Sequence, residues 1–336
     1  MELVRGLDYI IRKYERPVIT LGNFDGVHLG HQKIFSEVVQ AAHGVRGTAI
    51  VMTFDPHPAV ITNPHIQMKF LTPFDIKSRL IENSGVDVLI CIAFNKEFAS
   101  LSPEEFVKQI LVDRIGVAHV IVGHGFRFGK GKEGTTDNFR KLSKRFGFAF
   151  NVVRSVRRDG LVVSSSRIRE LLLKGDIADT NRLLDRPYFI EGIVVKGKGR
   201  GSKHLGIPTA NLCCADEFLP STGVYVVRVE IDGGGSSVED PHHLKQVGVE
   251  GLTNKFEGVA NVGLNPTFGN NELSCEVHLF DYSGDLLGSV LRTYFIKRLR
   301  DEMAFPSVET LKAQINSDIL QTKEFLKKRN RVNVNI

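Results

Sequence analysis

Residues 20–35 read TLGNFDGVHLGHQKIF, and this stretch decides the expected fold of the first half of the chain. The first residues of this stretch end a short β-branched, apolar run at residues 17–21. Such a run is the pattern of a buried parallel strand. The turn at residues 22–26 is rich in residues that tolerate unusual backbone angles. An apolar periodicity follows His28 and His31 and predicts a helix. A strand that passes through such a turn into a helix N-terminus predicts a phosphate site.

Length and composition limit the class of protein. A chain of 336 residues is too long for one ordinary core and predicts two domains. Its apolar runs, of which residues 86–94 are among the longest, are too short to cross a bilayer, and its N-terminus does not resemble a signal peptide. The four cysteines have no CxxC spacing. We therefore predict a reduced, cytoplasmic protein with no membrane partner, structural disulfide or zinc.

The formal net charge of +6 is compatible with a nucleic-acid partner. The basic residues are dispersed, however, or lie in glycine-rich loops at residues 130–132 and 196–200. One basic run, at residues 327–331, has the simple interpretation of a solvated tail. This distribution favours polyphosphate ligands over nucleic acid, so we expect small-molecule partners.

Strand and helix patterns alternate from residue 17 to about residue 184. Further strand runs lie at residues 48–54, 86–94, 118–122 and 148–153. Helix starts are marked by Thr72 as N-cap before Pro73, and by a capping box at residues 102–105. The alternation predicts an α/β domain with a parallel sheet, helices on both faces, and ligands at the carboxyl ends of the strands.

After a boundary at residues 185–187 the pattern changes to short strands separated by Gly, Pro and Asn turns. Strand patterns lie at residues 188–195, 223–231, 258–262, 274–280 and 289–299. A helix pattern follows Ser307. These features predict a small antiparallel β-barrel with a C-terminal helix. We interpret residues 233–257 as a flexible hairpin excursion.

Three loops are candidates for binding anions. His28 and His31 are suited to donate to a triphosphate and to neutralise charge during attack at its α-phosphorus. Residues 123–131 mix aromatic and basic groups, and residues 164–169 place hydroxyls and guanidinium groups at another helix start. The phosphate-binding candidates are Gly22, Asn23, Phe24, Asp25, Gly30, Ser164, Ser165, Ser166 and Arg169.

Other interpretations of the histidine pair stay open. The two imidazoles are compatible with a metal hydrolase that also uses Asp55 and His57, the nearest further ligands. They are also compatible with a histidine pair that only caps the helix.

Several sequence blocks together resemble the prokaryotic bifunctional riboflavin kinase/FAD synthetase family over nearly the whole chain. They are residues 22–31, 54–58, 126–129, 164–166 with Arg169, 206–211 and 276–279. The His-x-Gly-His signature alone is shared by many nucleotidyltransferases and by class I aminoacyl-tRNA synthetases. The Pro-Thr-Ala-Asn block at residues 208–211 is the discriminating one.

The resemblance implies two activities that need ATP and Mg²⁺. A Rossmann-like nucleotidyltransferase domain at residues 1–184 would transfer AMP from ATP to FMN, giving FAD and pyrophosphate. A barrel domain at residues 187–336 would phosphorylate riboflavin to FMN. The flavin-binding candidates are Phe54, Pro56, His57, Pro58, Phe126, Arg127 and Phe128.

In the barrel, the resemblance implies that Thr209 and Asn211 hold Mg²⁺ and ATP phosphate, and that Glu276 accepts the proton of the ribityl hydroxyl. Hard oxygen ligands suit Mg²⁺, and a glutamate on an alternating strand is suited to reach a hydroxyl in a pocket. A glycine-rich loop with Gly199 and Gly201 is suited to fold over the phosphates. Taken alone, the Thr209 block is also compatible with a simple turn, and Glu276 with an exposed strand residue.

Three departures from the family pattern bear on these expectations. Gly125 stands where the family commonly has Asp or Asn, so one hydrogen bond to flavin or adenine is absent or supplied by His124. Ser166 replaces the usual Thr and keeps the hydroxyl, and residues 233–257 exceed the usual hairpin. The alternatives are a kinase without adenylylation, a flavin-binding regulatory protein, and a class I synthetase, which would need a Lys-rich second signature. The sequence does not predict the oligomeric state.

Overall fold

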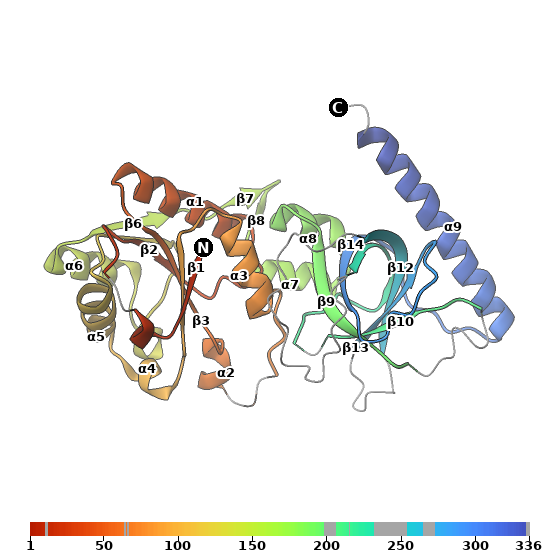
Figure 1. Ribbon diagram of the computed structural model, residues 1–336, viewed down its shortest axis with the longest axis horizontal. Coiled ribbons are helices and arrows are strands. Elements are labelled where there is room, and N and C mark those ends of the chain that lie inside the picture. Colours follow the sequence, from red (N-terminus) through yellow and green to blue (C-terminus); the bar gives the residue numbers. More distant parts are fainter. Residues whose placement is uncertain are drawn as a thin grey trace. The chain divides into compact units, whose positions relative to one another are not determined.

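The computed structural model describes residues 1–10, 13–63, 65, 67–197, 206–214, 216–231, 254–264 and 273–333. Two compact units, Met1–Arg167 and Ile168–Ile336, are called unit 1 and unit 2 below and are described separately (Figure 1). The catalytic domain ranges 1–184 and 187–336 stay predictions. Within the described ranges, every helix is too short or too polar to cross a membrane.

Unit 1 is built on a six-stranded parallel sheet in the order β1-β4-β3-β2-β5-β6, which confirms the predicted sheet. Its strands are β1 (Glu2–Arg5), β2 (Val18–Leu21), β3 (Ala49–Phe54), β4 (Val88–Ile92), β5 (His119–Gly123) and β6 (Ala149–Val153). The chain first extends from β2 to β3 and β4, and later continues on the other side of β2 with β5 and β6. In such sheets ligands bind beyond the carboxyl ends of the strands where the order reverses. Here that position is next to β2 and β5.

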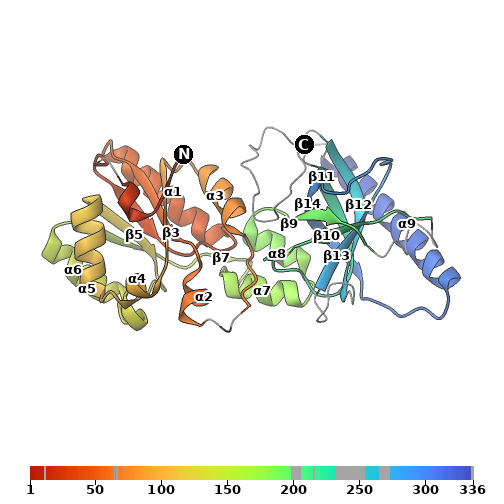
Figure 2. The same ribbon diagram turned by 60° about the horizontal axis from the view of Figure 1, so that its bottom comes forward.

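Helices cover both faces of this sheet (Figures 1 and 2). Val51 and Met52 are neighbours on β3 and therefore point to opposite faces. Val51 lies in a buried cluster with Phe35 of α1 and Ile81 of α3, and Met52 lies in another with Phe139 of α6. The helices and short strands of unit 1 are η1 (Leu7–Tyr9), α1 (Leu29–Gly44), α2 (Pro58–Thr62), α3 (Phe74–Glu82), α4 (Lys96–Ser100), α5 (Pro103–Glu105), η2 (Phe106–Ile115), η3 (Lys130–Lys132), α6 (Thr136–Phe146), β7 (Arg157–Arg158) and β8 (Leu161–Val162).

The predicted role of Thr72 as a helix cap is wrong. Helix α3 begins at Phe74, and its N-cap residue is Pro73, which has no side-chain cap. The Thr72 hydroxyl instead accepts the backbone N–H of Gly26 at 2.8 Å and donates to Asp25 Oδ1 at 3.3 Å. A partner distant in the sequence has replaced the local cap, so this hydroxyl holds the turn that carries the predicted phosphate site.

Unit 2 contains a closed barrel of antiparallel strands in the order β10-β13-β12-β11-β14-β9. Its strands are β9 (Tyr188–Val195), β10 (Ala210–Cys213), β11 (Gly223–Ile231), β12 (Asn254–Leu264), β13 (Leu273–Leu279) and β14 (Val290–Arg300). The predicted barrel is confirmed, although β10 is not among the predicted strands. Residues 254–257 belong to β12 rather than to the predicted hairpin excursion, whereas residues 232–253 lie outside the described residues.

Alternate residues of the barrel strands fill its interior. Tyr225, Val227, Cys275, Val277 and Phe295 are almost completely buried. Because successive side chains of a strand point to opposite faces, the residues between them lie on the outer face. The helices of unit 2 are α8 (Ile177–Leu184), α9 (Val308–Asn333) and the part of α7 (Ser165–Leu173) from residue 168 onward.

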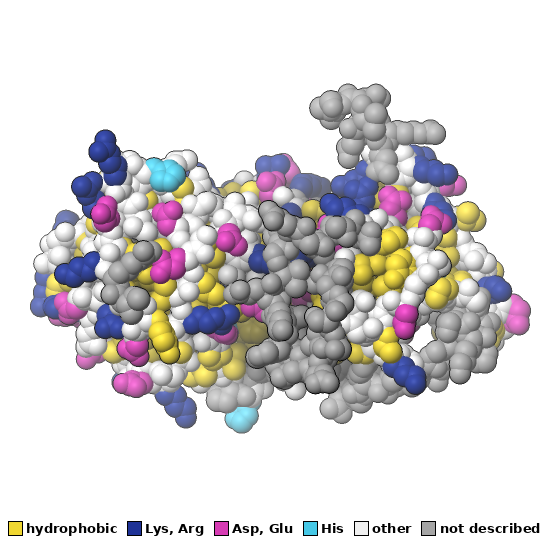
Figure 3. All heavy atoms as spheres, viewed as in Figure 1, with side chains coloured by type: hydrophobic (Ala, Val, Ile, Leu, Met, Phe, Trp, Pro, Cys, Tyr) yellow, Lys and Arg dark blue, Asp and Glu magenta, His cyan; other side chains and the backbone are white. Residues whose placement is uncertain are grey.

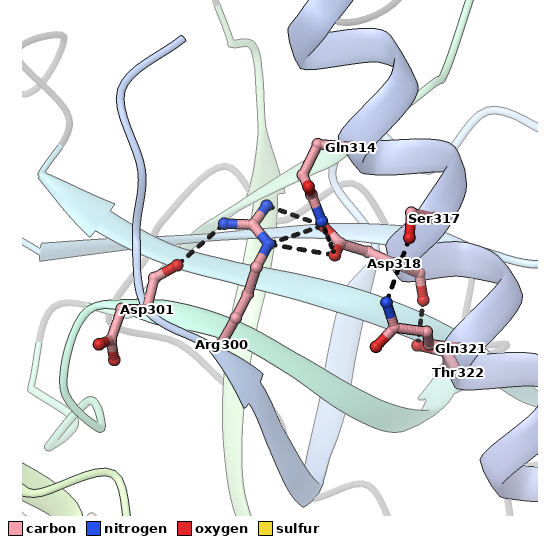
Figure 4. A network of polar contacts seen from close by, with 7 residues as sticks. All are labelled: Arg300, Asp301, Gln314, Ser317, Asp318, Gln321 and Thr322. Atoms are coloured by element: carbon pink, nitrogen blue, oxygen red, sulfur yellow. Dashed lines mark hydrogen bonds and ion pairs between the residues drawn. The ribbon is translucent and has the colours of Figure 1, made fainter.

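A buried ion pair attaches the predicted C-terminal helix to the barrel (Figure 4). Arg300, at the end of β14, donates to the two carboxylate oxygens of Asp318 on α9 at 2.7 and 3.1 Å. Gln314 donates to the same carboxylate at 2.9 Å. The Asp318 side chain is only 4% exposed, so removal of Arg300 would leave a buried charge uncompensated.

Charge is mixed on the visible surface. On the face drawn in Figure 3, Lys and Arg side chains of unit 1 are interspersed with Asp and Glu side chains. This distribution agrees with the dispersed basic residues of the sequence and does not form a single basic surface on that face.

Candidate functional site

The turn between β2 and α1 is tightly built. A Cβ atom at Gly22 would lie 2.9 Å from the ring of Phe24, so only glycine fits beside that ring. Phe24 is buried, and its ring meets the edge of the His31 ring with 5.2 Å between centroids. The turn therefore packs directly against one of the two predicted phosphate-binding histidines.

The two histidines lie together at the start of α1. Their rings are stacked with centroids 3.6 Å apart, and His28 Nδ1 accepts the backbone N–H of His31 at 3.3 Å. Because Nδ1 acts as an acceptor, a neutral His28 carries its proton on Nε2. A Cβ at Gly30 would approach the His28 ring to 3.1 Å, so Gly30 gives that ring room. His28 therefore caps α1 through this contact.

Asp25 ties the turn to two other segments. Its buried carboxylate accepts the backbone N–H groups of Leu71 at 3.3 Å and Thr72 at 2.9 Å. Its carbonyl oxygen accepts the Ser165 hydroxyl at 2.7 Å. The contact with Ser165 brings the serine-rich loop to the β2–α1 turn, as expected for two parts of one phosphate site. The carboxylate itself is directed to protein N–H groups.

Lys77, which the sequence analysis did not single out, supports the same turn. It is only 6% exposed, and its Nζ donates to the Asn23 carbonyl oxygen at 3.1 Å. Burial lowers the pKa of Lys77, and the charge of Asp25 opposes that shift. The signal in the sequence is a lysine four residues before Ile81, on the apolar face of a helix.

The remaining residues of the serine-rich loop are placed as follows. Ser164 accepts the backbone N–H of Arg167 at 3.2 Å, which is a helix-capping contact, and Ser166 is exposed. Arg169 belongs to unit 2, where its guanidinium lies 5.7 Å from the centroid of the Phe218 ring.

The flavin candidates at residues 54–58 lie at the carboxyl end of β3, which is the neighbour of β2 in the sheet. Phe54 is half-buried, and its ring contacts Phe94 and Phe98 with centroid distances of 5.5 and 5.9 Å. His57 Nδ1 accepts the backbone N–H of Ala59 at 3.1 Å and so caps α2. Pro56 and Pro58 flank this cap.

The flavin candidates after β5 divide into two groups. Phe126 is half-buried and Arg127 is exposed. Phe128 is 6% exposed and lies in the core cluster with Phe139, so its ring has a packing role. Gly125 is exposed, and a Cβ atom at this position would meet no atom within 4 Å.

The candidate residues of the barrel meet on one face of adjacent strands. Asn211 on β10 and Asn261 on β12 are the register partners of Glu276, which lies on β13 between them. Cross-strand partners share a face, here the outer one. Burial raises the pKa of the half-buried Glu276 carboxyl above its ordinary value. Asn261 was not singled out from the sequence, although an amide in the otherwise apolar run at residues 258–264 is a visible signal.

The backbone at Gly197 lies close to the side chain of Asn211. A Cβ at Gly197 would overlap the Asn211 carboxamide, so the backbone before the glycine-rich loop reaches this residue closely. Thr209 is exposed two residues before Asn211. Gly199 and Gly201 lie outside the described residues.

Comparisons with known proteins follow the same division of the chain. A family model described as FAD synthetase matches residues 10–167, and one described as riboflavin kinase matches residues 184–326. The chain is 37% identical to the bifunctional riboflavin kinase/FMN adenylyltransferase of Pseudomonas fluorescens, with 95% of this chain and 96% of that protein covered. It is 33% identical to the protein of that name from Escherichia coli strain K12, with 97% and 98% covered.

A solved structure has a similar fold over nearly its full length. It is described as a macrolide-efflux protein from Streptococcus pneumoniae. The TM-score is 0.81 at 29% sequence identity, and 96% of this chain and 99% of that chain are covered.

Proposed function

The chain belongs to the family of bifunctional riboflavin kinases/FMN adenylyltransferases, and we propose that its two reactions use separate groups of side chains in unit 1 and unit 2. The protein phosphorylates riboflavin with ATP and transfers AMP from ATP to FMN, so FMN is both a product and a substrate. The register of Asn211 with Glu276 is the observation that carries the assignment in the barrel.

In the kinase reaction, Glu276 is the general base. The ribityl hydroxyl of riboflavin attacks the γ-phosphorus of ATP, its proton passes to the Glu276 carboxylate, and the bond from that phosphorus to ADP breaks. A raised pKa supports this role, because a carboxylate in a desolvated site binds a proton more strongly. Asn261, on the other side of Glu276, is suited to hydrogen-bond the ribityl chain or the carboxylate.

The donor set of the barrel fits Mg²⁺. The Thr209 hydroxyl and the Asn211 carboxamide supply hard oxygen atoms, and Mg²⁺ commonly combines one or two protein ligands with phosphate oxygens and water. When bound there, the ion would neutralise the negative charge of the ATP phosphates. Asn211 is held in place by its ladder position between β9 and β13.

In the adenylyl transfer, a phosphate oxygen of FMN attacks the α-phosphorus of ATP, and pyrophosphate leaves. The FMN phosphate is already ionised, so the protein needs no base for this step. His28 and His31 stabilise the charge that develops on the triphosphate, and the α1 N-terminus contributes in the same direction. Asn23, Asp25 and Lys77 shape the turn that carries these groups.

The flavin contacts of this site are assigned to the loops after β3 and β5. Phe54, Phe126 and Arg127 are the side chains suited to contact a planar ring and a phosphate. Ser164 and Ser165 belong to the nucleotide side because Ser165 bonds the turn at Asp25. Cytoplasmic location and independence from nucleic acid stay predictions from the sequence.

The function is tested by product analysis. The protein is incubated with riboflavin, ATP and Mg²⁺, and the flavins are separated by chromatography. We expect FMN to appear first and FAD to accumulate from it. FMN without FAD would leave only the kinase, which is the specific alternative raised by Gly125. The absence of both products would favour a flavin-binding regulatory protein.

A further inference from the structure

A histidine on the Glu276 strand contacts the segment that precedes Asn211. His278 Nδ1 lies 2.8 Å from the carbonyl oxygen of Pro208. His278 is two residues after Glu276 on β13, so both side chains lie on the same face of that strand. The contact therefore joins the strand of the proposed base to the residue just before Thr209.

The chemistry of this contact defines its direction. A carbonyl oxygen only accepts, so His278 Nδ1 carries the hydrogen and donates it. Pro208 and Thr209 are exposed, and the β10 ladder with β13 begins one residue later, where Ala210 pairs with Val277. The imidazole thus extends the connection between the two strands by a side-chain hydrogen bond, at the point where the backbone ladder ends.

We propose that His278 is a positioning residue of the kinase site, which holds the Pro208 carbonyl and so sets the Thr209 hydroxyl relative to Asn211 and Glu276. This inference rests on the proposed role of Thr209 toward ATP and Mg²⁺. His278 does not touch the reacting atoms in this account. Its loss affects how well the phosphates and the ion are bound, and leaves the proton transfer to Glu276 in place.

Two substitutions separate the hydrogen bond from the bulk of the ring. His278→Leu removes the donor and keeps a side chain of moderate size. His278→Asn keeps an N–H group near the position of Nδ1. We expect His278→Leu to raise the kinase KM for ATP by about tenfold, with a smaller change in kcat, and His278→Asn to recover most of the loss.

The binding of Mn²⁺ in the presence of ADP, followed by electron paramagnetic resonance, gives a readout besides activity and should weaken in parallel for His278→Leu. Circular dichroism and thermal unfolding of each variant show whether the barrel is folded, and unchanged FMN adenylylation shows that unit 1 is intact. His119→Leu is a matched control, because His119 bonds Asn151 in unit 1 at 3.1 Å and has no part in the barrel.

The companion variant Thr209→Val separates the role of Thr209 from the role of His278. If Thr209→Val leaves ATP and Mn²⁺ binding unchanged, the proposed role of Thr209 is wrong, and the inference on His278 fails with it. If Thr209→Val weakens binding and His278→Leu does not, only the inference is overturned. Equal losses for His278→Leu and His278→Asn in folded protein would also overturn it.

Discussion

Asn211 and Glu276 face each other across the ladder of β10 and β13. The pairing places a carboxamide beside a carboxylate whose pKa is raised by burial. Neighbouring strands lie about 4.8 Å apart, a suitable span for a base that takes the proton of the nucleophile and a ligand that holds the phosphate under attack. This relationship makes the barrel a candidate for phosphoryl transfer independently of unit 1.

The role of Glu276 predicts a specific pH dependence of the kinase. A base must be deprotonated, and its ordinary pKa of about 4.3 is raised here by burial. Kinase kcat/KM should therefore fall as the pH decreases through a pKa above that ordinary value. Glu276→Gln should lose at least about 100-fold in kinase kcat and should no longer show this titration.

The control for this variant is Glu257→Gln, which removes a carboxylate of β12 that pairs with Arg228 at 3.8 Å. It should keep the acid limb of the kinase profile. The same limb in the Glu276→Gln profile would show that another group is the base. Because burial disfavours the charged form of Glu276 in the folded state, Glu276→Gln should also raise the Tm at neutral pH.

Gly125 offers a substitution that should improve the enzyme. A Cβ at this exposed position meets no atom within 4 Å, and the family resemblance implies Asp or Asn there. Gly125→Asn should restore one hydrogen bond and raise kcat/KM of FMN adenylylation by about fivefold, which corresponds to about 1 kcal/mol. The kinase rate should not change. An unchanged or lower adenylylation rate would contradict this prediction.

Lys77 should matter for adenylyl transfer although it lies under the turn. Lys77→Met keeps most of the side-chain volume and removes the donor to the Asn23 carbonyl oxygen. A buried acceptor left without this donor costs about 1–3 kcal/mol. We expect a KM for ATP in the FMN reaction raised about tenfold, with the kinase unaffected. Equal KM values for wild type and variant would contradict a positioning role.

The ion pair of Figure 4 predicts a large effect on stability. Arg300→Met leaves the Asp318 carboxylate buried without its main partner and should lower the free energy of unfolding by about 3 kcal/mol. Urea titration measures this loss. Lys174→Met, which breaks an exposed pair with Glu170, should cost less than about 0.5 kcal/mol. A loss below about 1 kcal/mol for Arg300→Met would contradict the account of this pair.

Much of the fold is predictable because it depends on local patterns. Apolar strand runs and helix periodicity locate the parallel sheet, and the capping box at residues 102–105 is confirmed. Strand β10 escapes prediction because it has four residues, too short a segment to show alternation. The pattern around Thr72 predicts a helix cap wrongly because its partner Asp25 is 47 residues away in the sequence.

The candidate sites are predictable only where motifs carry them. The histidine pair and Glu276 stand in recognisable blocks, but the neighbours that position them come from pairings distant in the sequence. Asn261 on β12 is the register partner of Glu276 on β13, and Lys77 on α3 donates to Asn23 in the turn between β2 and α1. Such contacts depend on the closed barrel and the packed sheet, which no local pattern specifies.

The central claim is that one chain holds two independent sites, and mixed variants test it most directly. His31→Ala and Glu276→Gln are each incubated with riboflavin, ATP and Mg²⁺, and then the two proteins are incubated together. We expect His31→Ala alone to stop at FMN, Glu276→Gln alone to leave riboflavin unchanged, and the mixture to form FAD. If the mixture formed no FAD, or if either folded variant lost both reactions, the assignment of two separate sites would be contradicted.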